Sequence, residues 1–354
     1  METVLYRKYR PKSFKEVLGQ DHIVKILAES VKLGHIAHAY LFAGSRGTGK
    51  TSVARILAEA AGVSQNDIYE MDAASNRGID EIRAIREGVF AAPFESKYKV
   101  YIVDEAHMLT KDAFNALLKT LEEPPAHVIF ILATTEMEKL PETVVSRCQV
   151  FKFKKPSQIA LKEMVTNVAK KEGFALEPAA VELIALLGDG SFRDALGVLQ
   201  KVIGASADKK ITEAEVAVAV GAPRAELINE MITALNENSA SGGLEAVRRA
   251  SEENIDMKIF LKLLLAKLRF ILLIRHAPEM KGEIAEEVSE KDFVFLQKIA
   301  DATPSSNFGE ASKKTGISAT TILEFLKAEE FLGAAAAPTL PLELAIIKLC
   351  DDKK

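Results

Sequence analysis

The sequence has no tryptophan, only two cysteines, and few aromatic residues, which make up 6% of its 354 positions. The two cysteines, Cys148 and Cys350, lie far apart, so they cannot supply a four-ligand zinc site or a disulfide framework. Long uncharged apolar runs are also missing. The most apolar stretch, 259–274, contains three basic residues, which predicts a buried helix rather than a membrane span.

Basic and acidic residues are also nearly balanced. The sequence has 46 Lys and Arg against 50 Asp and Glu, a formal net charge of −4. A partner that carries phosphates must therefore meet a local basic surface rather than a global positive field. The first residues, METVLYRKYRPKSF, contain no apolar run typical of a signal peptide. We expect a cytoplasmic protein with no membrane partner.

The first part of the chain alternates apolar runs with amphipathic stretches. The apolar runs lie at 39–44, 68–73, 99–106, 128–135 and 149–153. Strand, helix and strand at this cadence predict βαβ units and a mostly parallel sheet.

After Pro156 the pattern predicts helices only. One helix is expected over 157–172, a second begins near Pro178, and Ser191 caps a third, with Asp194 placed to complete a capping box. More helices are expected from 208 onward. Breaks are predicted at 221–223, 241–243, 277–278 and 303–304, with a helix end or connector at 334–337.

A phosphate-binding pattern, G-x-x-x-x-G-K-T, follows the first predicted strand and opens a predicted helix. Its glycines would let backbone N–H groups close around phosphates, Lys50 would reach the β and γ phosphates, and the Thr51 hydroxyl would hold Mg²⁺. We therefore expect ATP and Mg²⁺ as ligands. The segment reads Gly44, Ser45, Arg46, Gly47, Thr48, Gly49, Lys50, Thr51.

Polar residues end two later strands. KVYIVDE (99–105) ends in Asp104 and Glu105. Beside a phosphate-binding loop, Asp104 is expected to ligate Mg²⁺ through water and Glu105 to polarise the attacking water. ILATT (131–135) ends in Thr135, which is expected near the terminal phosphate because ligands bind at the carboxyl ends of parallel strands. A plain strand-capping role for Thr135 remains open.

Two arginines complete the candidate set. Arg147 lies in SRC (146–148), after a short helix predicted from Pro141, and Arg193 lies in the first turn of the helix capped by Ser191. A cation in a first turn opposes the helix dipole, which indicates an anionic partner for Arg193. A surface salt bridge remains the alternative for both arginines.

Longer blocks of the sequence are more specific than these motifs. They resemble the γ/τ subunits of the bacterial DNA polymerase III clamp loader, a family of AAA+ ATPases. The blocks are HAYLFAGSRGTGKTSVAR (38–55), DAASNRGIDEIR (72–83), DEAHMLTKDAFNALLKTLEEPP (104–125), LPETVVSRC (140–148) and GSFRDAL (190–196), with the N-terminal box YRKYRPKSFKEVLGQDH (6–22) and PLELAIIKL (341–349) at the end of the third domain.

The resemblance implies three domains: an α/β AAA+ P-loop ATPase domain with a parallel sheet (1–155), a small helical lid (156–207), and an all-helical oligomerisation collar (208–354). Thr135 matches the sensor-1 position. Arg147 matches an arginine finger that acts on the ATP of a neighbouring subunit, and Arg193 matches sensor 2, which touches the γ-phosphate in the same subunit. The N-terminal box is expected to pack on the adenine through Arg10, Pro11 and Val17.

The resemblance also implies partners. They are the sliding clamp, the δ and δ′ subunits, copies of this chain in a pentameric ring, and primer–template DNA at the nucleoid. The activity is an ATPase within the polymerase holoenzyme, associated with nucleotidyl transfer only through the polymerase. Helix starts, which suit phosphate contacts, are expected to face DNA inside the ring at Ser75, Asn76, Arg77, Thr110 and Lys111.

The sequence departs from the family in two places. Members usually carry a four-cysteine zinc module between the helix of the phosphate loop and the second strand. Here the link is GVSQND (62–67), without cysteine, so we expect no zinc. Longer members have further C-terminal domains, whereas the resemblance here ends with the third domain, so a short form is expected.

Three other functions remain open. One is another AAA+ machine, such as a branch-migration motor or a replication factor C-like subunit, which would not need the bacterial clamp. Another is a non-hydrolysing structural subunit, against which the set Lys50, Thr51, Asp104 and Glu105 argues. The third is a nucleotide-binding switch that does not bind DNA, because the basic residues are scattered.

Overall fold

The computed structural model describes residues 4–76, 78–206, 208–302 and 316–351. It divides into two compact units. The first comprises Met1–Met164 and Gly188–Gly197, and the second Val165–Leu187 and Val198–Lys354. Among the described residues no helix is both long and apolar enough to cross a membrane. The three domain boundaries expected from the sequence stay a prediction.

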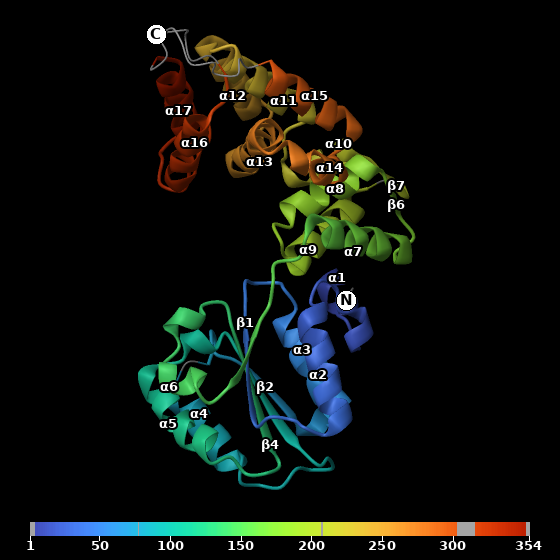
Figure 1. The fold of residues 1–354 in the computed structure, drawn as a ribbon, viewed down its shortest axis with the longest axis vertical. Coiled ribbons are helices and arrows are strands. Elements are labelled where there is room, and N and C mark those ends of the chain that lie inside the picture. The colour runs from blue at the N-terminus through green and yellow to red at the C-terminus, as the bar shows by residue number, and fades with distance from the viewer. Residues whose placement is uncertain (1–3, 77, 207, 303–315, 352–354) are drawn as a thin grey trace. The chain divides into compact units, whose positions relative to one another are not determined.

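A five-stranded parallel sheet forms the centre of the first unit (Figure 1). Its order is β2-β3-β4-β1-β5, and each strand falls within one of the predicted apolar runs. The strands are β1 (Ala39–Ala43), β2 (Ile68–Asp72), β3 (Lys99–Asp104), β4 (Val128–Thr134) and β5 (Gln149–Lys152).

Helices cover both faces of this sheet. Successive side chains of β1 alternate between the faces: Tyr40 and Phe42 pack with α2 and α3, while Ala39 and Leu41 pack with α4, α5 and α6. Burial of one side chain as large as Phe42 contributes about 1.5–3 kcal/mol. The helical elements are α1 (Leu5–Lys8), η1 (Phe14–Glu16), α2 (Asp21–Leu33), α3 (Lys50–Ala60), η2 (Gln65–Asp67), α4 (Ile79–Gly88), η3 (Ala106–Met108), α5 (Lys111–Glu122), η4 (Met137–Lys139) and α6 (Glu142–Val145).

The remaining described chain is almost entirely helical, as predicted. The three helices expected after Pro156 are present, and the Ser191 hydroxyl accepts the N–H of Asp194 at 3.2 Å, which is one half of the expected capping box. The elements are α7 (Gln158–Lys171), β6 (Ala175–Leu176), α8 (Pro178–Leu187), α9 (Phe192–Ala205), β7 (Lys210–Ile211), α10 (Glu213–Val220), α11 (Ala225–Asn236), α12 (Ala240–Glu252), α13 (Met257–His276), η5 (Pro278–Met280), α14 (Lys281–Glu287), α15 (Glu290–Asp301), α16 (Ala319–Phe331) and α17 (Leu340–Asp351).

One predicted break is wrong. Residues 241–243 lie inside α12, whose first turn is capped by Ser239 through a 3.2 Å hydrogen bond from the N–H of Gly242. The glycines there serve packing instead. A Cβ on Gly243 would lie 2.9 Å from the side chain of Ile346 on α17. The breaks expected at 221–223 and 277–278 are present, and that at 303–304 lies outside the described residues.

A buried carboxylate just before β2 is hydrogen-bonded to the loop 94–96. Asp67 is fully buried and accepts backbone N–H groups from Phe94, from Glu95 at 3.0 Å and from Ser96 at 2.8 Å. Burial alone would raise the pKa of Asp67, but these hydrogen bonds outweigh it and lower that pKa to about 2. Asp67 is the last residue of the GVSQND link (62–67), which contains no cysteine.

We expect Asp67→Ala to lower the free energy of unfolding by about 2–4 kcal/mol, because buried N–H groups lose a charged acceptor. The folded pKa lies below the ordinary value of 3.8. The stabilisation is therefore complete above that value and is lost as the pH falls through about 2. Urea unfolding at neutral pH and in acid measures both effects. The matched control is Asp21→Ala at the exposed start of α2, and an equal loss in the two variants would contradict the assignment.

Candidate functional site

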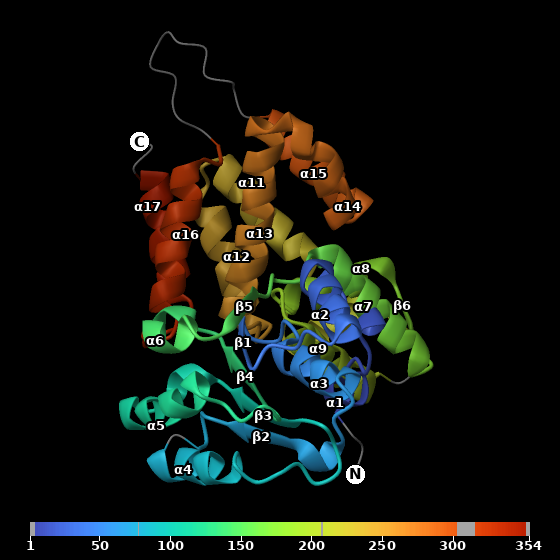
Figure 2. The ribbon, with the colours of Figure 1, turned by 60° about the horizontal axis from the view of Figure 1, so that its bottom comes forward.

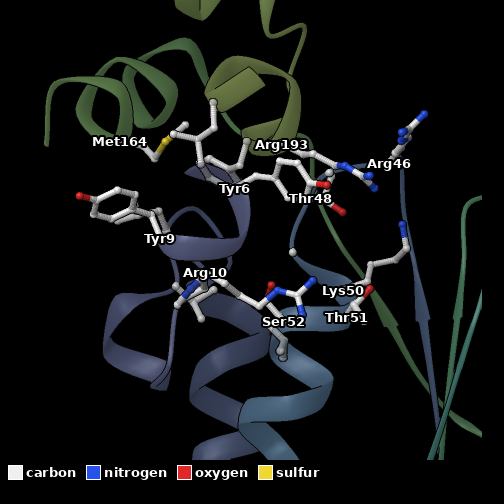
Figure 3. A pocket seen from close by; sticks show the side chains of 18 of the residues that line it. Tyr6, Tyr9, Arg10, Arg46, Thr48, Lys50, Thr51, Ser52, Met164 and Arg193 are labelled. Atoms are coloured by element: carbon white, nitrogen blue, oxygen red, sulfur yellow. The ribbon is translucent and has the colours of Figure 1, made fainter. Parts of the chain in front are cut away.

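A cavity of about 210 Å³ lies in the first unit at the start of α3 (Figure 3). Its wall comes from the N-terminal segment, the phosphate-binding loop, the end of β3 and the start of α9. Many of the residues singled out in the sequence meet here, because parallel strands bring their carboxyl ends to one edge of the sheet. Those that line the cavity are Arg10, Pro11, Val17, Arg46, Gly47, Thr48, Gly49, Lys50, Thr51, Asp104, Glu105 and Arg193.

The ammonium group of Lys50 is held inside the loop. It donates to the carbonyl oxygens of Gly44 at 2.7 Å and Ser45 at 2.9 Å, and the residue is 6% exposed. Burial lowers the pKa of Lys50, although Glu105 and Asp104 act in the opposite direction. A cation buried this way is incompletely compensated by neutral carbonyls, so the site favours an anionic ligand.

The start of α9 is docked on the same loop. The N–H of Phe192 donates to the carbonyl of Gly47 at 3.0 Å. Gly47 has a φ of +74°, and a Cβ added there would lie 1.9 Å from the Ser191 hydroxyl oxygen. Only glycine fits this position without moving α9.

The carboxylates at the end of β3 face the first turn of α3. The Thr51 hydroxyl donates to Asp104 Oδ2 at 2.7 Å. Glu105 follows in the left-handed region, with φ 48° and ψ 43°. A non-glycine residue in such a conformation costs on the order of 1–3 kcal/mol and is common at functional sites.

The two threonines at the end of β4 have different contacts. Thr135 donates to Glu105 Oε2 at 3.0 Å. The fully buried Thr134 hydroxyl lies 3.0 Å from His107 Nδ1, and the other ring nitrogen of His107 lies 3.2 Å from Glu136 Oε1. Thr135 therefore contacts the candidate water-activating carboxylate rather than lining the cavity. His107 lies in the block 104–125, but no motif in the sequence indicates a role for it.

The N-terminal segment contributes side chains that sequence reasoning missed. Tyr6 and Tyr9 line the cavity from α1 and the residue after it, and Met164 lines it from α7 (Figure 3). The three-residue spacing of the tyrosines on one helical face was the available signal. Arg10 lies with them, and its pKa is lowered by burial and by Arg55.

Arg147 lies away from this cavity. Its guanidinium contacts Glu122 Oε1 at 2.6 Å and the carbonyl of Thr143 at 2.6 Å, and its side chain is 33% exposed. It is not among the residues that line the cavity. In this structure Arg147 therefore contacts α5 and α6 of its own chain.

The candidate DNA contacts begin two helices on one face of the sheet. Thr110 caps α5 by accepting the N–H of Ala113 at 3.2 Å, and Lys111 is the first residue of that helix. Asn76 lies in the exposed turn before α4, where its N–H donates to Asp72. Ser75 lies in the same turn, and Arg77 lies outside the described residues.

Among the described residues no group of three or more His, Cys, Asp or Glu side chains is arranged to hold a metal ion. Cys148 is half-buried, and burial raises its pKa to about 11. Cys350 is buried in α17. The absence of zinc stays a prediction.

Two families match successive parts of the chain. A family described as DNA polymerase III, delta subunit, matches residues 19–77 and 63–157. The ATPase lid domain of the DNA polymerase III clamp-loader subunit matches residues 160–208.

Curated relatives match most of the chain. DNA polymerase III subunit tau of Bacillus subtilis is 36% identical over 98% of this chain and 63% of its own length. Subunit tau of Escherichia coli is 37% identical over 79% of this chain and 46% of its own length. The chain thus spans about half to two thirds of these relatives.

Among solved structures, the Holliday junction branch migration motor RuvB of Thermotoga maritima is similar. It has a TM-score of 0.52 at 23% identity, over 65% of this chain and 80% of the motor. At that identity the likeness supports the fold alone. Together with the ATPase lid match over residues 160–208 and the five-stranded parallel sheet, it confirms the fold class expected from the sequence.

We expect Gly47→Ala to displace the start of α9 from the phosphate-binding loop, because the added methyl group overlaps the Ser191 hydroxyl. Gly49→Ala is the matched control, since Gly49 has a φ of +99° but no heavy atom within 4 Å of the added Cβ. Both carry the cost of a left-handed alanine, roughly 1 kcal/mol or more. Hydrogen exchange at the amide of Phe192 should rise far more in Gly47→Ala. Equal exchange in both variants would contradict the docking.

Proposed function

This chain belongs to the γ/τ subunit family of bacterial DNA polymerase III, and on that premise we propose that it is an ATP-hydrolysing subunit of the clamp loader. In this role it opens a sliding clamp and places it on primer–template DNA. One observation carries the proposal: the convergence of Lys50, Asp104, Glu105 and Arg193 on one cavity. A non-hydrolysing structural subunit has no need of that set.

The residues present fit a nucleotide polyphosphate. The Ser45 hydroxyl oxygen is buried and has no hydrogen-bond partner among the described residues. The Lys50 ammonium donates to two neutral carbonyls of its own loop. The loop leads into the N-terminus of α3, where backbone N–H groups favour anions. Tyr9, Pro11 and Val17 give the cavity an apolar wall suited to a base.

The donor set also fits Mg²⁺, which prefers oxygen ligands. Thr51 and Asp104 would hold the ion, which neutralises phosphate charge when bound. Lys50 faces the β and γ phosphates, and Arg193 approaches the γ-phosphate from α9. Glu105 orients the attacking water and accepts its proton, while the hydrogen bond from Thr135 steadies the Glu105 carboxylate.

The proposed catalytic set is completed by a neighbouring subunit. Arg147 lies outside its own cavity, and an arginine supplied in trans stabilises charge on the transferring phosphoryl group. In our proposal ATP binds at interfaces of a pentameric ring with δ and δ′ subunits. Clamp and DNA align Arg147 with the neighbouring ATP, and hydrolysis releases the loader at the nucleoid. Any link to nucleotidyl transfer is through the polymerase it serves.

DNA contact is proposed at the starts of α4 and α5. Ser75 and Asn76 lie in the turn before α4, and Thr110 and Lys111 begin α5. Arg77, the fifth candidate, lies outside the described residues. Helix N-termini suit phosphate oxygens without reading sequence. A nucleotide switch that ignores DNA would show ATP turnover independent of primed template. A branch-migration motor would show turnover independent of the clamp.

Assembly is proposed to use the surface of α16 and α17, which pack side by side in the second unit (Figure 2). Large apolar side chains are exposed on both helices, which is typical of an interaction surface. They are Leu323, Leu326, Phe331, Leu340, Leu344 and Ile347, each more than 40% exposed.

We expect Leu344→Glu to weaken subunit assembly without unfolding the chain, because Leu344 is 57% exposed and a buried charge in an interface is costly. The matched control, Val218→Glu on α10, changes a side chain that is 81% exposed and should assemble normally. Sedimentation with δ and δ′ subunits measures the difference. Assembly of Leu344→Glu at wild-type concentrations would argue against this surface.

The main test of the function concerns Arg147. We expect Arg147→Ala to keep its ATP affinity and to lose most of the ATPase stimulation by clamp and primed DNA, since such fingers contribute about 10³–10⁵ in rate in favourable cases. Mixing Arg147→Ala with Lys50→Ala subunits should restore part of the activity, because one interface then pairs an intact loop with an intact finger.

The control is Arg248→Ala, which removes an arginine paired with Glu245 and Glu252 on α12 and should leave stimulation unchanged. If Arg147→Ala keeps its stimulated rate, Arg147 is only a surface ion pair and the trans mechanism fails. If the mixture merely sums its parts, Arg147 acts within its own subunit.

A further inference from the structure

The backbone of Arg193 is fixed to the phosphate-binding loop. The N–H of the preceding residue, Phe192, donates to the carbonyl of Gly47 at 3.0 Å. A Cβ added to Gly47 would overlap the Ser191 hydroxyl. The position of the Arg193 α-carbon is therefore set by the loop. The direction of its long side chain is not set by these contacts.

An aromatic ring from the N-terminal helix α1 supplies that direction. Arg193 is an exposed residue, and its guanidinium lies over the ring of Tyr6, 4.7 Å from the ring centroid (Figure 3). The face of an aromatic ring attracts a cation at this distance, and a planar guanidinium also stacks on it.

Tyr6 is itself held in place. It is half-buried in α1, directly after Leu5, which is only 7% exposed. Burial acts to raise the pKa of the Tyr6 phenol, but Arg193 and Arg7 outweigh it, so this pKa lies below its ordinary value. The contact between the Tyr6 ring and the Arg193 guanidinium thus joins α1 to the start of α9.

We propose that Tyr6 is a positioning residue that holds the Arg193 guanidinium at the cavity wall, where it reads the terminal phosphate and favours a nucleoside triphosphate over a diphosphate. The proposal rests on the function proposed above. An unrestrained arginine side chain loses much rotamer freedom when it binds a ligand, and a side chain already held loses less. The advantage applies only to a ligand that reaches Arg193.

Nucleotide specificity separates this role from simple packing. A residue that only supports the fold or touches the base would affect diphosphate and triphosphate binding alike. Tyr6 should affect the ratio of the two affinities. The effect should also depend on Arg193, because Tyr6 acts through it.

The test uses the full chain and compares the Kd of a non-hydrolysable ATP analogue with that of ADP by calorimetry. The key variant is Tyr6→Leu, which keeps apolar bulk and removes the ring face, and Tyr6→Phe keeps the face. We expect Tyr6→Leu to reduce the preference for the triphosphate by about two- to fivefold, the size of an exposed cation–π contact. Tyr6→Phe should retain most of that preference.

Two further variants complete the design. Tyr9→Leu changes another aromatic residue of the same cavity, one whose ring lies 5.5 Å from the Lys8 ammonium, and should leave the ratio unchanged. In an Arg193→Gln background, Tyr6→Leu should have no additional effect on the ratio.

The outcomes are distinguishable. If Arg193→Gln leaves the ratio unchanged, the proposed role of Arg193 fails and the inference fails with it. If Arg193→Gln lowers the ratio but Tyr6→Leu does not, only the role of Tyr6 is overturned. An effect of Tyr6→Leu that persists in the Arg193→Gln background, or that Tyr6→Phe shares in full, also overturns it.

Discussion

The contact between Gly47 and Ser191 joins two segments that are distant in sequence, and the candidate site depends on it. The N–H of Phe192 donates to the carbonyl of Gly47. This backbone hydrogen bond fixes the start of α9 relative to the phosphate-binding loop. Lys50 enters the cavity from one segment and Arg193 from the other. A side chain at Gly47 would overlap Ser191 and push the start of α9 away from the loop.

Much of the first unit could be predicted because its signals are local. The five apolar runs became five strands, and the spacing from Gly44 to Thr51 required a loop between a strand and a helix. The end of β3 then brought Asp104 against Thr51. Each of these inferences needs only neighbours in sequence and the rule that parallel strands share one carboxyl edge.

The features that escaped prediction come from long-range packing. No local pattern indicates that Glu105 adopts a left-handed backbone or that Asp67 is buried among N–H groups of residues 94–96. At the end of β4 the sequence pattern predicts a role for Thr135, whereas the structure also gives Thr134 a contact with His107. At 241–243 the glycines predict a helix break, but in the structure Gly243 lies within α12 and allows that helix to approach α17 closely.

The way Lys50 is bonded bears on how an anion binds. Its ammonium group donates to the carbonyls of Gly44 and Ser45. The loop conformation is therefore stabilised by hydrogen bonds within the loop itself. In the proposed site, an anion that binds would exchange hydrogen-bond partners with a loop that is already ordered. We therefore expect anion binding here to show the small heat-capacity change of a small buried surface, rather than the large change of coupled folding.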